Sequence, residues 1–181
     1  GGTGKGIIAK SLGKMRAYQE MDFKTRANNQ FVLQGLRAGV NVVHFGDPKR
    51  NFDFSQFFNF ISDDTEIENK NAGRIELKFD DSPKVIISSN FPIQGEAGSY
   101  RRRLIEHELC NAFNAEYTPF DYFGHMLFTD WSNEEWNRFD NFMVGCLQTY
   151  LKNGLIKPNH VNLKKRKLVS ETNEDFVTWC D

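Results

Sequence analysis

The sequence predicts an α/β portion followed by a helical portion. A glycine-rich turn, GGTGKG, leads into a stretch with apolar residues at helical spacing. Two apolar runs, at residues 40–45 and 84–88, have the length and composition of buried strands. The last third of the chain contains strong helix-start signals. A length of 181 residues suits one domain with a small appendage.

The composition is that of an ordinary globular protein. Lysine and arginine number 23 against 24 acidic residues, and 39% of residues are hydrophobic. This near-neutral balance predicts that any contact with nucleic acid is local. No apolar run approaches the roughly 20 residues of a membrane span, so we expect no membrane association. The cysteines are odd in number and far apart, which argues against a disulfide framework and favours the cytoplasm.

The first elements follow from hydrophobic spacing. The stretch after the glycine-rich turn carries apolar residues at helical intervals, namely Ile7, Ile8, Leu12 and Met15. Residues 30–33 and 40–45 are apolar runs separated by Gly35 and Gly39, and we expect two buried strands. Residues 53–61 indicate a short helix, and the 17 phenylalanines predict a phenylalanine-rich core.

A β-hairpin is expected next. Residues 65–68 and 74–79 flank the turn-forming sequence NKNAG, and apolar residues alternate along the second arm. The run KVIIS at residues 84–88 predicts a further strand, which ends just before Asn90. Residues 103–109 alternate weakly and predict another strand.

The helical portion is defined by its capping residues. Thr118 precedes Pro119, and Ser132 precedes Glu135 in a capping-box pattern, so each pair marks a helix start. The second helix should end near Gly154. We therefore divide the chain into residues 1–116, 117–157 and a basic tail, 158–181, in which the sequence KKRK is typical of a solvated stretch.

The motif GGTGKG is typical of the end of a phosphate-binding loop. Its glycines let backbone amides surround phosphate oxygens, Lys5 can reach the terminal phosphates, and the helix dipole favours the negative charge. The candidate nucleotide-binding residues are Gly2, Thr3, Gly4, Lys5 and Gly6. The alternative is a glycine turn that merely starts a helix.

Three further positions suit the same chemistry. Asp47 ends the strand VVHFGD, where a carboxylate can hold the Mg²⁺ of a nucleotide. Asn90 ends the next apolar strand and can orient an attacking water. Arg101 and Arg102 can neutralise charge in a transition state, or else form a solvated patch beside nearby glutamates. The order of these features along the chain favours a nucleotide site.

The sequence resembles the ATPase domain of superfamily 3 helicases, in the AAA+ class, as found in primase–helicases of phages, plasmids and mobile elements. The segments that carry the resemblance are GGTGKG, VVHFGD, KNAGRIELKF, SPKVIISSN, SYRRRLIEHEL and FGHMLFTDWSNEEWNRFDNFM, and together they cover about residues 1–157. The resemblance implies a P-loop NTPase fold. It would comprise a parallel AAA+-like sheet flanked by helices, a β-hairpin insertion and a helical C-terminal portion.

The resemblance also implies a function, that of an ATP-dependent DNA helicase. Lys5 would be the phosphate-loop lysine, Asp47 the Walker B acid on Mg²⁺, and Asn90 the sensor. Arg101 or Arg102 would be an arginine finger acting on the neighbouring subunit of a ring, with a hexamer as the expected size. The hairpin, with Lys70 and Arg74 beside its turn, would contact single-stranded DNA.

Three departures from the family pattern keep other functions open. Gly6 replaces the hydroxyl residue that ligates Mg²⁺, Gly46 and Pro48 leave Asp47 without a second acid, and the strand before the phosphate loop is absent from the sequence. One alternative is a catalytically degenerate AAA+-like module for assembly or DNA binding. The other is a stand-alone P-loop NTPase, such as a small-molecule kinase.

Overall fold

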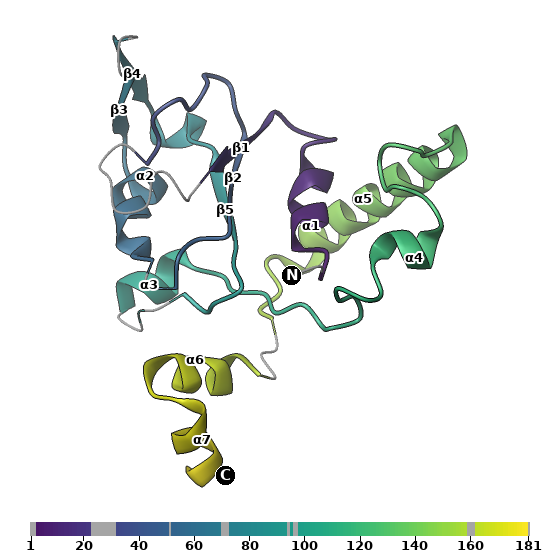
Figure 1. Cartoon of the computed structure of the whole chain (residues 1–181). Coiled ribbons are helices and arrows are strands. Elements are labelled where there is room, and N and C mark those ends of the chain that lie inside the picture. The colour runs from purple at the N-terminus through teal and green to yellow at the C-terminus, as the bar shows by residue number, and fades with distance from the viewer. Residues whose placement is uncertain are drawn as a thin grey trace. The chain divides into compact units, whose positions relative to one another are not determined.

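The computed structural model confirms a mixed α/β chain (Figure 1). It describes residues 3–22, 32–50, 52–69, 73–93, 95, 98–158 and 162–180. The chain divides into two compact units. The sheet unit comprises Lys5–Leu104 with Val161–Asp181, and the helical unit comprises Gly1–Gly4 with Ile105–His160.

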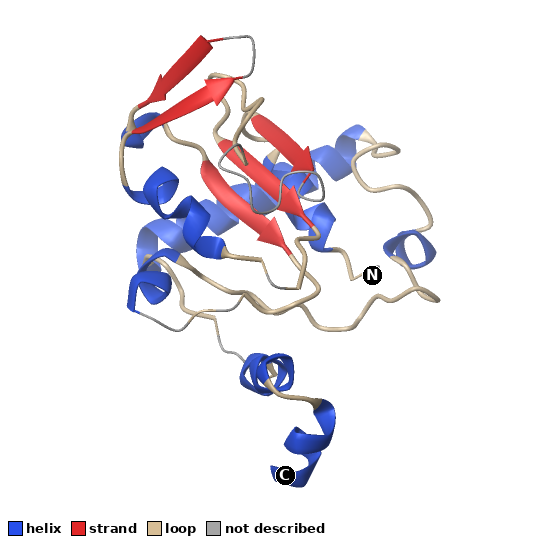
Figure 2. Ribbon diagram, turned by 60° about the vertical axis from the view of Figure 1, so that its left-hand side comes forward, coloured by secondary structure: helices blue, strands red, loops and turns tan. Residues whose placement is uncertain are grey.

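The sheet unit is built on three parallel strands. These are β1 (Tyr18–Asp22), β2 (Val42–Gly46) and β5 (Lys84–Ser88), in the order β1-β2-β5. Figure 2 shows their arrows pointing the same way. β2 is the central strand and four of its five residues are buried, as expected for a parallel strand covered on both faces. The carboxyl ends of all three strands therefore meet at one edge of the sheet.

The two faces of this sheet are covered by different elements. Helix α1 (Lys5–Leu12) lies on one side, and η1 (Phe54–Phe57) with α2 (Phe58–Ser62) lies on the other (Figure 1). Phe45 of β2 packs against Phe57 with ring centroids 5.0 Å apart. The core around this contact confirms the predicted richness in phenylalanine, with Phe45, Phe52, Phe54, Phe57 and Phe60 all buried.

The predicted hairpin is confirmed as the antiparallel pair β3 (Thr65–Asn69) and β4 (Gly73–Leu77). Ile67 and Ile75 lie opposite each other, and Ile67 is buried in the core while Glu66, Arg74 and Glu76 are exposed. The predicted turn at residues 70–72 lies outside the described residues. A short 3₁₀ helix, η2 (Phe79–Asp81), then leads to β5.

Several sequence predictions for the sheet unit are wrong. The described part of the strand predicted at residues 30–33 is a turn, and Leu33 fills the core from this turn instead. The strand predicted at 103–109 does not form, because α3 (Gly98–Arg103) runs to Arg103 and the chain is then irregular. β1 was not predicted, since YQEMD has a single buried residue, Met21. The basic tail forms α6 (Leu163–Glu171) and α7 (Glu174–Cys180).

The helical unit follows the predicted capping signals. Both predicted helix starts are confirmed, at α4 (Pro119–Phe123) and α5 (Asn133–Asn153), and each carries a capping box, of which only the second was predicted. At the second, the amide of Ser132 donates to the Glu135 carboxylate at 3.0 Å and the Glu135 amide donates back to the Ser132 hydroxyl at 3.3 Å. α5 ends before Gly154, whose φ is +67°. None of the helices in the described ranges combines the length and apolar character needed to cross a membrane.

Candidate functional site

Lys5, Asp47 and Asn90 come together at the carboxyl edge of the sheet, although they are far apart in sequence. The Lys5 ammonium donates to the side-chain oxygen of Asn90 at 2.5 Å. The side-chain amide of Asn90 donates to Asp47 Oδ1 at 3.2 Å. A cation, an amide and a carboxylate thus form one hydrogen-bonded chain.

Local structure explains why these side chains converge. Lys5 is the first residue of α1, and Asp47 and Asn90 follow the ends of β2 and β5. The backbone amide of Asp47 donates to the Ser88 carbonyl at 2.9 Å, so the pairing of these strands extends one residue beyond β2. Asp47 has a φ of +48°, in a region that aspartate and asparagine occupy more readily than most other residues. Asp47 and Asn90 are exposed, while Lys5 is half-buried.

A second cation reaches the same residue from the C-terminal segment. Arg166 of α6 donates from its guanidinium to the backbone carbonyl of Asn90 at 2.8 Å. The sequence predicts a solvated stretch around Arg166, because a run of like charges carries no signal for a specific tertiary partner. Lys5 and Arg166 thus place two cations beside Asn90, against the single carboxylate of Asp47, and this balance suits an anionic ligand.

The glycine-rich motif is only partly described. Gly2 lies outside the described residues, and Thr3 and Gly4 immediately precede α1. Gly4 has a φ of +82°, a conformation that glycine adopts freely. At Gly6, and likewise at Gly46, an added Cβ would meet no atom within 4 Å. Packing therefore does not exclude a side chain at the two positions where the sequence departs from the family pattern.

The three consecutive arginines of α3 are not equivalent. Arg103 donates to the Ser62 hydroxyl at 2.6 Å and stacks over the Phe58 ring at 4.9 Å, so it anchors α3 to α2. Arg101 and Arg102 are exposed. Among the described residues, no hydrogen bond or ion pair joins either of them to Lys5, Asp47 or Asn90.

The hairpin is rich in acidic residues, although it was predicted to contact the negatively charged backbone of single-stranded DNA. Between Asp63 and Asp81 the sequence has seven carboxylates and three cations. Arg74 pairs with Glu66 at 3.3 Å, and Lys78 contacts both Asp64 and Glu76. Lys70, the other predicted DNA contact, lies outside the described residues. DNA binding by this hairpin stays a prediction.

Asp47 is the residue that could hold Mg²⁺ beside a bound nucleotide. Mg²⁺ commonly takes one or two protein carboxylates and completes its shell with phosphate oxygens and water. An exposed carboxylate next to a lysine and an amide fits this type of coordination, with most ligands supplied by the nucleotide. Across the described ranges, no group of three or more His, Cys, Asp or Glu side chains could form a metal site made of protein ligands alone.

A row of hydrogen-bonded side chains centred on the buried His44 crosses the sheet beside this cluster and was not predicted. The Tyr18 hydroxyl lies 2.7 Å from His44 Nδ1, and His44 Nε2 lies 2.7 Å from the Ser88 hydroxyl. Burial lowers the pKa of His44, with an opposing effect from Glu20, and burial together with Glu20 raises the pKa of Tyr18 to about 12. The only sequence signal was a histidine within an apolar strand.

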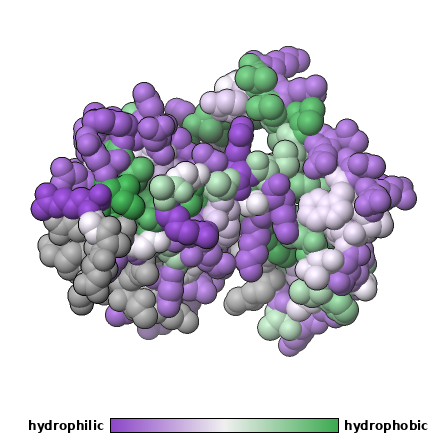
Figure 3. Space-filling model, turned by 90° about the horizontal axis from the view of Figure 1, so that it is seen from above, coloured by the Kyte–Doolittle hydropathy of each residue, from purple (hydrophilic) through white to green (hydrophobic). Residues whose placement is uncertain are grey.

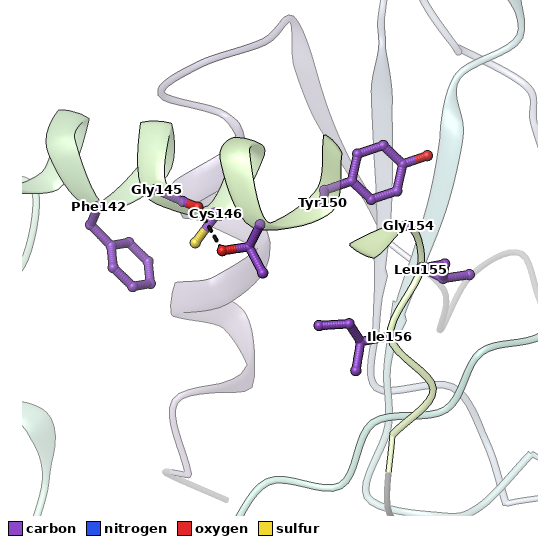
Figure 4. Close-up of a pocket in the computed structure, with 8 residues that line it drawn as sticks. Phe142, Gly145, Cys146, Tyr150, Gly154, Leu155 and Ile156 are labelled. Atoms are coloured by element: carbon purple, nitrogen blue, oxygen red, sulfur yellow. Dashed lines mark hydrogen bonds between the residues drawn. The ribbon is translucent and has the colours of Figure 1, made fainter. Parts of the chain in front are cut away.

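The helical unit contains an apolar pocket. A cavity of about 520 Å³ is lined by residues of α5 and the segment after it, including Phe142, Cys146, Tyr150, Leu155 and Ile156 (Figure 4). α5 contains no buried residue. Apolar residues at the surface are visible in Figure 3 as green atoms among purple ones. This pocket lacks the polar groups that fix the orientation of a small ligand.

Comparisons with protein-family models, with curated proteins and with solved structures found no match to this chain. The features that point to a function are therefore the cluster of Lys5, Asp47 and Asn90 and the residues around it.

Proposed function

We propose that the chain binds ATP-Mg²⁺ at the cluster of Lys5, Asp47 and Asn90, as the ATPase part of a nucleic-acid motor. The observation that carries this proposal is the hydrogen-bonded chain from Lys5 through Asn90 to Asp47 at the carboxyl edge of a parallel sheet. Ligands of open α/β sheets bind outside the carboxyl ends of the strands, and this cluster occupies that place.

Each residue has a distinct part in this proposal. Lys5 would exchange the Asn90 oxygen for a phosphate oxygen and balance the negative charge of the terminal phosphates. Asp47 would hold Mg²⁺, which offsets charge on the phosphates during transfer. Asn90 would be released from Lys5 by the nucleotide, and its side-chain oxygen would then be free to orient a water molecule.

Nucleotide binding is tested on the 181-residue chain by titration with a fluorescent ATP analogue in the presence and absence of Mg²⁺. Lys5→Ala should weaken binding at least about tenfold, because a charge-assisted contact contributes about 1.5–3 kcal/mol. Lys10→Ala, on the exposed side of the same helix, is the matched control and should bind normally. Asp47→Asn should remove the Mg²⁺ dependence while keeping a residue that tolerates the positive φ.

A wild-type chain that binds no nucleotide would contradict the proposal. So would affinity that Lys5→Ala and Asp47→Asn leave unchanged.

The motor part of the proposal requires hydrolysis completed by a neighbouring subunit. Arg101 and Arg102 are exposed on a helix that Arg103 anchors, so they are free to face another subunit. In a ring, Lys5→Ala subunits mixed with Arg101→Ala/Arg102→Ala subunits should recover part of the ATPase activity, because some sites then contain both intact groups. Failure to recover activity in co-assembled samples would exclude action by these arginines in trans.

Single-stranded DNA is the proposed substrate of this motor. Removing charge at Lys70 and Arg74 should weaken DNA binding and flatten its salt dependence, while nucleotide binding stays normal. An unchanged salt dependence would assign the DNA contact to another surface.

A second candidate is an AAA+-like module that binds nucleotide without hydrolysing it. Two observations favour it: Asp47 has no second acid beside it, and Arg74 is paired with Glu66 on the hairpin. Gly46→Glu separates the two candidates, since an added Cβ meets open space there. In the motor, the wild type already hydrolyses ATP. In the binding module, the wild type and the control Gly46→Ala bind nucleotide without hydrolysing it, and only Gly46→Glu, which supplies a second acid beside Asp47, should gain turnover.

A further inference from the structure

We propose that His44 is a positioning residue for the candidate site: through Ser88 it fixes the strand end that carries Asn90. The proposal rests on the function proposed above, because it assigns Asn90 a role in nucleotide binding. His44 itself would touch neither nucleotide nor metal. Its part is to hold β2 and β5 in the arrangement that brings Asp47 and Asn90 within hydrogen-bonding distance.

The geometry places one polar side chain from each strand on the same face of the sheet. In the register of the sheet, Tyr18 lies opposite Val42 and His44 lies opposite Ile86. His44 therefore follows Val42, the partner of Tyr18, by two residues. Ser88 likewise follows Ile86, the partner of His44, by two residues. Because side chains alternate with a period of two, all three point to the face covered by α1.

The hydrogen bonds from Tyr18 through His44 to Ser88 end beside the candidate site. Ser88 is the last residue of β5, and its carbonyl accepts the Asp47 amide at 2.9 Å. Asn90 follows two residues later and donates to Asp47. His44 thus contacts Ser88, whose backbone carbonyl binds Asp47 and which precedes Asn90 by two residues.

Packing alone does not account for a histidine at this position. His44 is 2% exposed in a strand whose other core positions are Val42, Val43 and Phe45. A buried imidazole loses solvation that an apolar side chain would not, and this cost is offset only when both ring nitrogens are hydrogen-bonded. Here both nitrogens have partners at 2.7 Å. Because its hydrogen-bonding groups are paired, this network fixes the positions of β1, β2 and β5 relative to one another. A valine at position 44 would not do so.

The test compares variants of the full chain that break the Ser88 contact with a variant that destabilises the opposite face. Ser88→Ala removes the hydroxyl that contacts His44, Ser88→Thr keeps a hydroxyl, and His44→Phe removes both ring contacts. Val43→Ala is the matched control, because Val43 is fully buried next to His44 but belongs to the phenylalanine-packed face. The first measurement is the side-chain amide resonance of Asn90 by NMR without nucleotide. The second is affinity for the fluorescent ATP analogue with Mg²⁺.

Ser88→Ala and His44→Phe should shift the Asn90 side-chain resonance and weaken nucleotide binding about tenfold, the effect typical of residues that orient a ligand-binding group. Ser88→Thr should restore both measurements, and Val43→Ala should change neither despite its loss of stability. An unchanged Asn90 resonance in folded Ser88→Ala protein overturns the proposal. An equal effect of Val43→Ala also overturns it, since the change would then follow stability.

The two measurements also separate this proposal from the proposed function. If the wild-type chain binds no nucleotide, the ATP site fails, but the Asn90 resonance still decides whether His44 positions Asn90. If nucleotide binds in a Lys5-dependent manner while Ser88→Ala leaves both measurements unchanged, the ATP site stands and the role of His44 fails.

Discussion

The sheet unit and the helical unit bury their apolar residues to very different extents. In the sheet unit, Phe45, Phe57 and Phe60 are almost fully buried in one core. In the helical unit, the 21-residue helix α5 has no buried residue, and Phe142 and Leu151 are exposed. The sheet is therefore held by long-range packing, whereas α5 depends on local signals such as its capping box. The candidate site lies in the unit whose packing can hold side chains in a fixed geometry.

The two units should differ most in the stability that each loses when one phenylalanine is replaced by alanine. Phe57→Ala should cost about 3–5 kcal/mol of the free energy of unfolding of the sheet unit, because it leaves a cavity in the core. Phe142→Ala, the same change at a residue 66% exposed in α5, should cost less than about 0.5 kcal/mol. Hydrogen exchange of β2 and α5 amides measures each unit separately. Similar costs at the two sites would show that α5 is packed as tightly as the sheet.

Acidification should weaken the sheet unit through His44 and leave α5 unaffected by this residue. Burial holds the pKa of His44 below its ordinary value of 6.5, against Glu20 and Asp47 and together with Lys10. At a pH between the lowered pKa and 6.5, His44 is therefore protonated in the unfolded chain and neutral in the folded chain. Stability from this group is complete above pH 6.5 and is lost as the pH falls toward the lowered pKa. One proton limits the slope to about 1.4 kcal/mol per pH unit.

This pH dependence is measured as denaturant unfolding of the wild type and of His44→Phe between pH 5 and pH 8. The wild type should lose more stability on acidification than the variant. Identical pH dependence in both proteins would mean that the folded state accommodates a charged His44.

A smaller effect is expected at the start of α5. Ser132→Ala removes the hydroxyl that accepts the Glu135 amide and should cost about 1 kcal/mol of helix stability. Asn141→Ala, at an exposed position within the same helix, should not destabilise it, because alanine has the higher helix propensity. Circular dichroism and exchange of the first-turn amides test this pair. If Asn141→Ala destabilised α5 as much as Ser132→Ala does, the effect at Ser132 would not be due to capping.

The sequence predicted elements wherever the signal is local. The helices after Thr118 and Ser132 are fixed by caps, and the hairpin by an alternating arm and a turn, so each was found. The apolar runs of β2 and β5 were found as well, whereas segments without a strong pattern of their own were missed or wrongly predicted. β1 has one buried residue and forms because β2 provides an edge for pairing, whereas the weakly alternating residues 103–109 pair with no strand in the described part of the chain.

The same distinction applies to the candidate site. Lys5, Asp47 and Asn90 could be selected from sequence, because each follows a recognisable loop or an apolar strand. The contacts of His44 with Tyr18 and Ser88 depend on strand order and register, which the sequence does not state. The contact of Arg166 with Asn90 similarly joins residues that are 76 positions apart.

The parallel pairing of β2 with β5 has a consequence for folding. Val42 and Lys84 are register partners, so the whole hairpin must be accommodated between them before the pairing can form. Closing such a chain segment costs conformational entropy before any contact is gained, whereas β3 with β4 and the turns of α5 close locally. We therefore expect α5 and the hairpin to form early in folding. The residues of the candidate site, which need β2 and β5 side by side, should be among the last to reach their native positions.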